Sequence, residues 1–233
     1  MNAISPDQAL LAIESLRAGI PIRIATQLLP DLHADITEQV RQDLLQLKQG
    51  TLPQGRLIWG QYGQGKTHML TTIEHTALDM GFAVSRISLS REISCHHLFY
   101  LYNRLATVIR VPDSNFAGLR RVLNQKRASD LNNSLLHVSN RYIHPLPFIA
   151  LEDYFYSEGE EQDLFYGELM GHRLPLPELR RLHRACRQRA LPRFEITFKP
   201  NEHASAYFGL MADVIQFCSY KGWVLLIDEV ELM

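Results

Sequence analysis

Eight residues in the first third of the chain have the spacing of a phosphate-binding loop. Gly60-Gln-Tyr-Gly-Gln-Gly-Lys66-Thr67 fits the pattern G-x-x-x-x-G-K-[ST]. The glycines let successive backbone amides turn toward one point without a Cβ in the way. A helix beginning near Gly65 would add free N–H groups and the positive end of its dipole. The alternative is a glycine-rich turn with a surface lysine.

The types of the residues in this loop predict a site for ATP with Mg²⁺. Lys66 would bridge the β- and γ-phosphates and Thr67 would offer its hydroxyl to Mg²⁺. His68, next to the loop, is expected on the helix surface rather than in a catalytic role. The residues expected to contact ATP are Gly60, Gln61, Tyr62, Gly63, Gln64, Gly65, Lys66, Thr67 and His68.

A second motif, which ends in two acidic residues, lies close to the other end of the sequence: Val224-Leu-Leu-Ile-Asp228-Glu229. Four apolar residues predict a buried strand that delivers Asp228 to its carboxyl end, where ligands of parallel sheets bind. Asp228 would hold the Mg²⁺, and Glu229 would orient and deprotonate the attacking water. A kinase does not need a carboxylate there, so the pair favours ATP hydrolysis with Glu229 and Lys66 as catalytic residues. Alternatively, the two acids are solvated at a strand exit.

The elements that would position these residues can be read from the pattern of apolar residues. Short apolar runs predict strands at 56–59 and 82–89, with a helix between them that ends at Gly81. We expect two helices within 1–50, mainly helical structure over 91–150 that ends at Pro145 and Pro147, and a buried helix over 204–219. This strand–loop–helix–strand order predicts an α/β fold with a parallel sheet.

The chain divides by composition into three parts. We predict an N-terminal helical segment at 1–50, an ATPase core at 51–90 and 204–233, and a mostly helical, charged insertion at 91–203. Lys66 and Asp228 are 162 positions apart, which the insertion would explain.

Bulk composition excludes several classes of protein. Of the 233 residues, 46% are hydrophobic, which supports a full core, and the formal net charge of -1 gives no global attraction to nucleic acid or membrane. No apolar run is long enough for a membrane span, and the N-terminus does not resemble a signal peptide. Three widely spaced cysteines make a disulfide framework improbable, so we expect a cytoplasmic protein.

An arginine-rich segment at 173–193 suggests contact with DNA. At helical spacing Arg180, Arg184 and Arg187 share a face, and Leu179, Leu182, Cys186 and Ala190 lie on the other. The alternative is that seven carboxylates at 152–168 pair with this helix. Tyr154, Phe155 and Tyr156 could stack on bases, although such a run more often packs within its own domain.

Two groups of histidine and cysteine residues could suggest a metal site, but neither supplies enough ligands for one. Cys95, His96 and His97 have no second ligand pair at a recognised spacing. His183 and Cys186 stand three residues apart, and two ligands do not make a site. We therefore expect no metal apart from the Mg²⁺ that accompanies ATP.

The two motifs GQYGQGKT and VLLIDE resemble the Walker A and Walker B motifs of ASCE-division P-loop ATPases, which include AAA+ proteins. Three segments are also similar to the ATP-binding proteins of bacterial BREX-type phage-defence systems: AIESLRAGIP at 12–21, the Walker A segment, and YFGLMADVIQFCSYKGWVLLIDEVE at 207–231. The resemblance implies an AAA+-like parallel sheet. It also implies a partnership with other defence-system proteins and a possible homo-oligomer.

In ASCE proteins the strand after Walker B carries a sensor residue and lies between the Walker A and Walker B strands. A later lid and usually an arginine finger follow. The resemblance implies that these lie beyond residue 233, so that the sheet of residues 1–233 is incomplete at its C-terminal end and the fragment alone turns over little ATP. The alternative function is a nucleotide-responsive scaffold that binds ATP without hydrolysing it.

Overall fold

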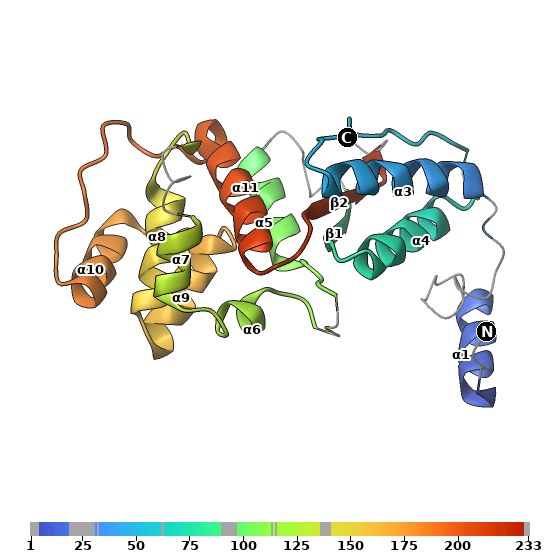
Figure 1. Cartoon of the computed structure of the whole chain (residues 1–233), viewed down its shortest axis with the longest axis horizontal. Coiled ribbons are helices and arrows are strands. Elements are labelled where there is room, and N and C mark those ends of the chain that lie inside the picture. Colours follow the sequence, from blue (N-terminus) through green and yellow to red (C-terminus); the bar gives the residue numbers. More distant parts are fainter. Residues whose placement is uncertain are drawn as a thin grey trace.

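The computed structural model describes residues 5–18, 31, 33–61, 63–89, 97–112, 114, 116–135 and 141–230. Over these ranges, helices surround two parallel strands near the middle of the molecule (Figure 1). The predicted α/β class is confirmed at this level.

The two strands of the sheet come from opposite ends of the sequence. β1 (Ala83–Ser88) pairs with β2 (Trp223–Asp228), so that Ser88 lies opposite Asp228. Both correspond to predicted strands. Because parallel strands end at the same edge, this pairing places Asp228 at the carboxyl edge of the sheet, as the sequence predicts.

One face of the sheet is covered by α4 (Lys66–Asp79), which in turn packs against α3 (Ala34–Lys48). The buried side chains of this layer are Leu44, Met69, Ile73, Ala77, Phe82, Val84 and Leu226. Gly81 ends the α4 region with a φ of +91°, a conformation that favours glycine. With α1 (Pro6–Arg17), α3 confirms the two helices predicted within 1–50.

The other face meets α5 (Leu98–Thr107), beside which lies α11 (Pro200–Phe217). The Ser85 hydroxyl donates to the Leu105 carbonyl (2.7 Å) and accepts from Trp223 Nε1 (2.9 Å). One buried serine therefore connects β1 to both α5 and β2. The buried helix predicted over 204–219 is confirmed by α11.

The remaining helices form a body that continues the core of the sheet. They are α6 (Arg120–Leu123), α7 (Ala128–Ser134), α8 (Leu146–Tyr156), α9 (Gly159–Leu169) and α10 (Leu176–Arg187). Tyr102, Tyr154, Phe165 and Tyr207 are fully buried in it, together with Ala83 of β1. The aromatic run at 154–156 therefore begins with a core residue, since Tyr154 packs within its own domain.

A buried polar pair joins α8 to α10. His183 Nδ1 lies 2.6 Å from Asp153 Oδ2, and both side chains are almost inaccessible to solvent. Burial raises the pKa of the Asp153 carboxyl, and the contact with His183 opposes that rise. His183 is thereby paired with Asp153 inside the helical body.

The strand predicted at 56–59 is wrong. Residues 51–61 run without regular secondary structure, and the side chains of Leu57 and Trp59 are 76% and 86% exposed. Arg56 is instead bound to Asp43 of α3 and donates to Gln39 Oε1 at 2.9 Å. The physical reason is the lack of a neighbour, since a strand needs a hydrogen-bonded partner and β1 alone pairs with β2 among the described residues.

The predicted helix end at Pro145 and Pro147 is also wrong. Pro145 is the N-cap residue of α8, and Pro147 lies in its first turn. A proline has no N–H to donate, and the first N–H groups of a helix have no partner in the helix. These prolines therefore begin a helix, where the sequence pattern predicted the end of one.

The predicted arginine face of α10 is only partly correct. Arg187 lies 3.9 Å above the Tyr156 ring and 3.5 Å from Glu152, with 13% of its side chain exposed. It therefore packs against α8 and does not share the exposed face of Arg180 and Arg184. The opposite face is confirmed at Leu179 and Leu182, which are buried.

Candidate nucleotide-binding site

The loop 60–65 leads directly into α4. Gly63 and Gly65 have φ values of +82° and +79°, and Gly65 is the N-cap residue of the helix. An L-residue would be strained in this conformation, which explains the glycines at these two places. The first amides of α4 therefore face the loop without helical partners. Tyr62 lies outside the described residues.

The polar groups of the loop bond to one another. Lys66 Nζ donates to the carbonyls of Gly60 (2.7 Å) and Gln61 (3.0 Å), and the Gln61 amide donates to Gln64 Oε1 (2.8 Å). A Cβ on Gly60 would come within 2.8 Å of that same Gln64 oxygen, so a larger residue here would displace the end of the Gln64 side chain. His33, which the sequence pattern did not indicate, contacts the Gln64 carbonyl through Nε2 at 3.0 Å.

The structure brings Thr67 and Asp228 together. Thr67 Oγ1 donates to Asp228 Oδ2 at 3.3 Å, although the two residues are 161 positions apart. The other carboxylate oxygen, Oδ1, accepts from the Glu229 amide at 3.0 Å. Asp228 is 7% exposed, so this carboxylate lies mostly buried where α4 begins and β2 ends.

This arrangement suits a small, hard cation. Hydroxyl and carboxylate oxygens are the ligands that Mg²⁺ prefers. Two ligands at about 2.1 Å from an octahedral ion lie about 3 Å apart, close to the observed separation of Thr67 Oγ1 and Asp228 Oδ2. Within the described ranges, no cluster of three or more histidine, cysteine or acidic residues could hold a metal by itself. Cys95 and His96 lie outside those ranges.

Glu229 has an unusual backbone. It is exposed and has a φ of +59°, which non-glycine residues adopt at a cost. Such strain often occurs at functional sites, where the surrounding structure holds it. Within the part of the chain that the structure describes, its carboxylate makes no hydrogen bond or ion pair, so it is free to meet a solvent molecule.

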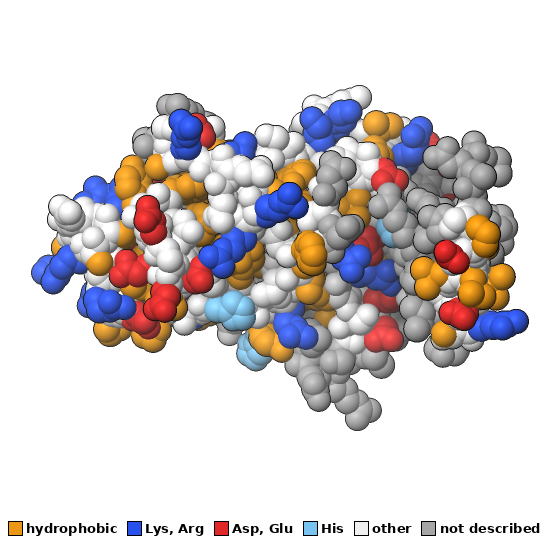
Figure 2. All heavy atoms as spheres, turned by 90° about the horizontal axis from the view of Figure 1, so that it is seen from below, with side chains coloured by type: hydrophobic (Ala, Val, Ile, Leu, Met, Phe, Trp, Pro, Cys, Tyr) orange, Lys and Arg blue, Asp and Glu red, His pale blue; other side chains and the backbone are white. Residues whose placement is uncertain are grey.

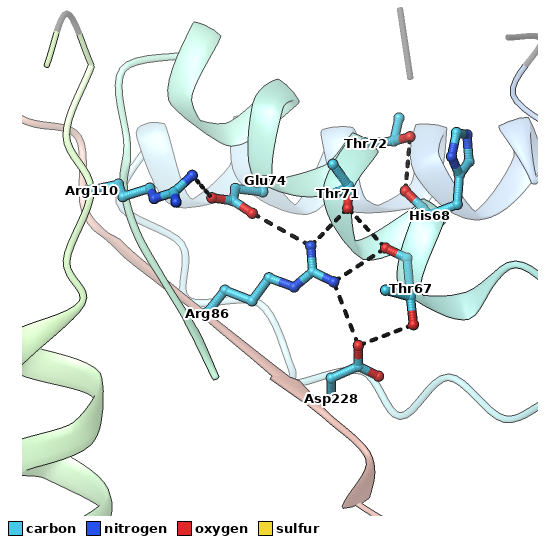
Figure 3. Close-up of polar contacts among 8 residues, drawn as sticks. All are labelled: Thr67, His68, Thr71, Thr72, Glu74, Arg86, Arg110 and Asp228. Carbon is cyan, nitrogen blue, oxygen red and sulfur yellow. Dashed lines mark hydrogen bonds and ion pairs between the residues drawn. The ribbon is translucent and has the colours of Figure 1, made fainter. Parts of the chain in front are cut away.

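His68 is placed differently from the other residues of the motif. Its carbonyl accepts from Thr72 Oγ1 at 3.2 Å, and its imidazole points away from Asp228 (Figure 3). The expectation that His68 lies on the surface of the helix agrees with this orientation. Its imidazole contributes nothing to the contact between Thr67 and Asp228.

Arg86 is a residue of this site that the sequence pattern did not indicate. It projects from the middle of β1 toward α4, and its guanidinium lies between Glu74 and Asp228 (Figure 3). The signal was present in the sequence Ala-Val-Ser-Arg-Ile-Ser, because an arginine within a half-buried strand needs acceptors nearby. What the sequence could not show is which acceptors these are.

A cleft of about 590 Å³ opens beside the site. Lys66, Asp228 and Glu229 are among its lining residues, together with apolar residues of α3, of α4, of 52–59 and of β2. Leu225 of β2 is 38% exposed there, so β2 is less buried than the sequence predicts. The cleft separates the same two segments between which the family resemblance implies a further strand.

The helices of the described ranges include none that is long and apolar enough to cross a membrane. A comparison with known protein families matches residues 4–134 to the family described as "BREX system ATP-binding protein BrxC/D". The matched range is more than half of the 233-residue chain and includes the loop 60–67. Comparisons with curated proteins and with solved structures gave no match. The chain therefore belongs to the BrxC/D family of BREX system ATP-binding proteins.

Proposed function

We propose that the protein binds ATP with Mg²⁺ at the start of α4 as a P-loop ATPase and hydrolyses it in the service of phage defence. The contact between Thr67 Oγ1 and Asp228 Oδ2 carries this proposal, because it unites two distant motifs at one edge of a parallel sheet. Bound Mg²⁺ would neutralise charge on the phosphates and polarise them. The chain's own residues would bind the phosphates, hold the metal and activate the attacking water.

The role of each residue follows from its position. Lys66 would leave the Gly60 and Gln61 carbonyls and donate to phosphate oxygens, which carry more negative charge than a carbonyl. Thr67 and Asp228 would hold the Mg²⁺. Glu229, with a free carboxylate at the strand end, would orient the attacking water and accept its proton.

The Glu229→Gln variant tests hydrolysis separately from binding. An amide cannot accept the proton, so the variant should keep ATP affinity within about threefold while turnover falls about 100-fold or more. The measurements are an ATP-binding titration and phosphate release in the full-length protein, with Glu195→Gln, an exposed glutamate far along the chain, as the control. If ATP acts only as a switch, the wild type should show binding without turnover and the variant should change neither quantity.

Contact with DNA is a further part of the proposal, but fewer arginines of the segment 173–193 are available for it than the sequence suggests. Arg173 lies 4.3 Å above the Phe198 ring and 3.6 Å from Glu168, so it and Arg187 serve packing. On the face seen in Figure 2, basic and acidic side chains alternate at the end of the molecule that carries α8–α10. Such a mixed surface gives only a weak field for a phosphate backbone.

On α10, the exposed Arg180, Arg181 and Arg184 are left as the residues that would contact DNA. Replacing all three with glutamine should weaken DNA retention and make its salt dependence less steep, by about one unit of slope for each phosphate that is no longer neutralised. Retention on immobilised duplex DNA across a salt series measures this. Unchanged retention would show that α10 makes no contact with DNA.

Cytoplasmic location, self-association and partnership with other defence proteins stay predictions.

A further inference from the structure

Arg86 is held mainly by α4 and only loosely by Asp228. Its Nη1 donates to Thr71 Oγ1 at 2.7 Å, and its Nη2 donates to the Thr67 carbonyl at 3.3 Å. Its contact with Asp228 Oδ2, at 3.5 Å, is longer than either. The side chain is 21% exposed, so water shields this charge only in part. The guanidinium would therefore keep its place if Asp228 turned to another partner.

Glu74, the other acid that contacts Arg86, does not fully neutralise it. Glu74 Oε2 lies 3.6 Å from Arg86, but Glu74 Oε1 also lies 3.1 Å from Arg110. Two arginines thus share one carboxylate that is 7% exposed (Figure 3). The positive charge that remains faces Asp228, the residue proposed to hold Mg²⁺.

Asp228, in turn, does not depend on Arg86 for its position. Its backbone belongs to β2, its Oδ1 accepts from the Glu229 amide, and its Oδ2 accepts from the Thr67 hydroxyl. Loss of Arg86 would therefore leave the carboxylate in place but free of a neighbouring positive charge. A divalent cation that approaches Asp228 meets repulsion as long as Arg86 is present, because like charges a few ångströms apart in a partly buried site are poorly screened.

We propose that Arg86 competes with the divalent cation for Asp228 and so sets the Mg²⁺ concentration at which the site binds ATP. This rests on the proposed function, since it assigns a regulating residue to the same nucleotide site. In the absence of the metal, Arg86 acts as the counter-charge of Asp228. When the metal is bound, the Arg86 guanidinium would keep its bonds to α4 and lower the affinity of Asp228 for the cation. Tight binding of the metal would then need the phosphate oxygens of ATP as further ligands.

The test is the Mg²⁺ dependence of ATP binding in Arg86→Gln and Arg86→Lys. The Gln variant removes the charge and should lower the half-saturating Mg²⁺ concentration about fivefold to tenfold. The Lys variant keeps the charge and should stay within about twofold of the wild type. ATP affinity measured with a chelator present should change far less than the Mg²⁺ requirement. Arg104→Gln, at an exposed position of α5, is the matched control.

Two further measurements keep the outcome clear. Arg86→Gln leaves Glu74 with one partner fewer. The double variant Arg86→Gln/Glu74→Gln restores the net charge of the cluster formed by residues 74, 86 and 110 and should show the same fall in the half-saturating Mg²⁺ concentration. Mn²⁺ binding followed by electron paramagnetic resonance, without nucleotide, should also be tighter in Arg86→Gln. An unchanged or increased Mg²⁺ requirement in Arg86→Gln and in the double variant would overturn the proposal. If the wild type bound no ATP, the proposed function would fail, while the Mn²⁺ measurement would still decide the role of Arg86.

Discussion

Lys66→Ala should lose most of the protein's affinity for ATP. Charge-assisted hydrogen bonds are each worth about 1.5–3 kcal/mol, so loss of the ammonium should weaken binding by about 10-fold to 150-fold. The fold should be nearly unaffected, because within the described residues the Lys66 ammonium donates only to the carbonyls of Gly60 and Gln61, and Gln61 is exposed to water. An ATP titration by calorimetry, together with a thermal unfolding curve, measures both quantities.

Lys48→Ala provides the matched control for this variant. Lys48 is the last residue of α3, the helix that packs against α4, and is exposed, so its replacement removes the same charge without touching the loop. It should bind ATP as the wild type does. If Lys66→Ala kept its affinity within about threefold, the loop would bind no phosphate through its lysine.

Those parts of the fold that depend on apolar pattern alone could be predicted from the sequence. A run of apolar residues placed β2, and helical spacing with a terminal glycine placed α4. The position of Asp228 at the carboxyl edge followed from strand length. These features are local, so neighbouring residues were enough to predict them.

The features that the sequence did not reveal depend on distant partners. Residues 56–59 have the composition of a strand, but no strand pairs with them in the described part of the chain. The spacing of Arg187 predicts that it lies on the exposed face of α10, but its side chain packs against Tyr156 and Glu152 of α8. Arg86 reaches the site only because β1 and β2 pair in a register that sets Ser88 opposite Asp228.

A second large effect is expected from Asp228→Asn in the presence of Mg²⁺. The amide carries no charge and is a poor ligand for a hard cation, so the Mg²⁺-dependent part of ATP affinity should fall by more than about tenfold. ATP binding in a chelator should change much less, since the phosphates would still meet Lys66 and the amides of α4. Thr67→Ala should have a smaller effect of the same kind.

These two variants together test whether one cation lies between α4 and β2. The measurement is a double-mutant cycle of Thr67→Ala and Asp228→Asn on ATP affinity, run with Mg²⁺ and again with a chelator. If both residues hold the same Mg²⁺, the double variant should lose little more than Asp228→Asn alone, with a coupling of about 1 kcal/mol or more that appears only with Mg²⁺. Additive losses, equal with and without the metal, would contradict a shared site for magnesium and ATP.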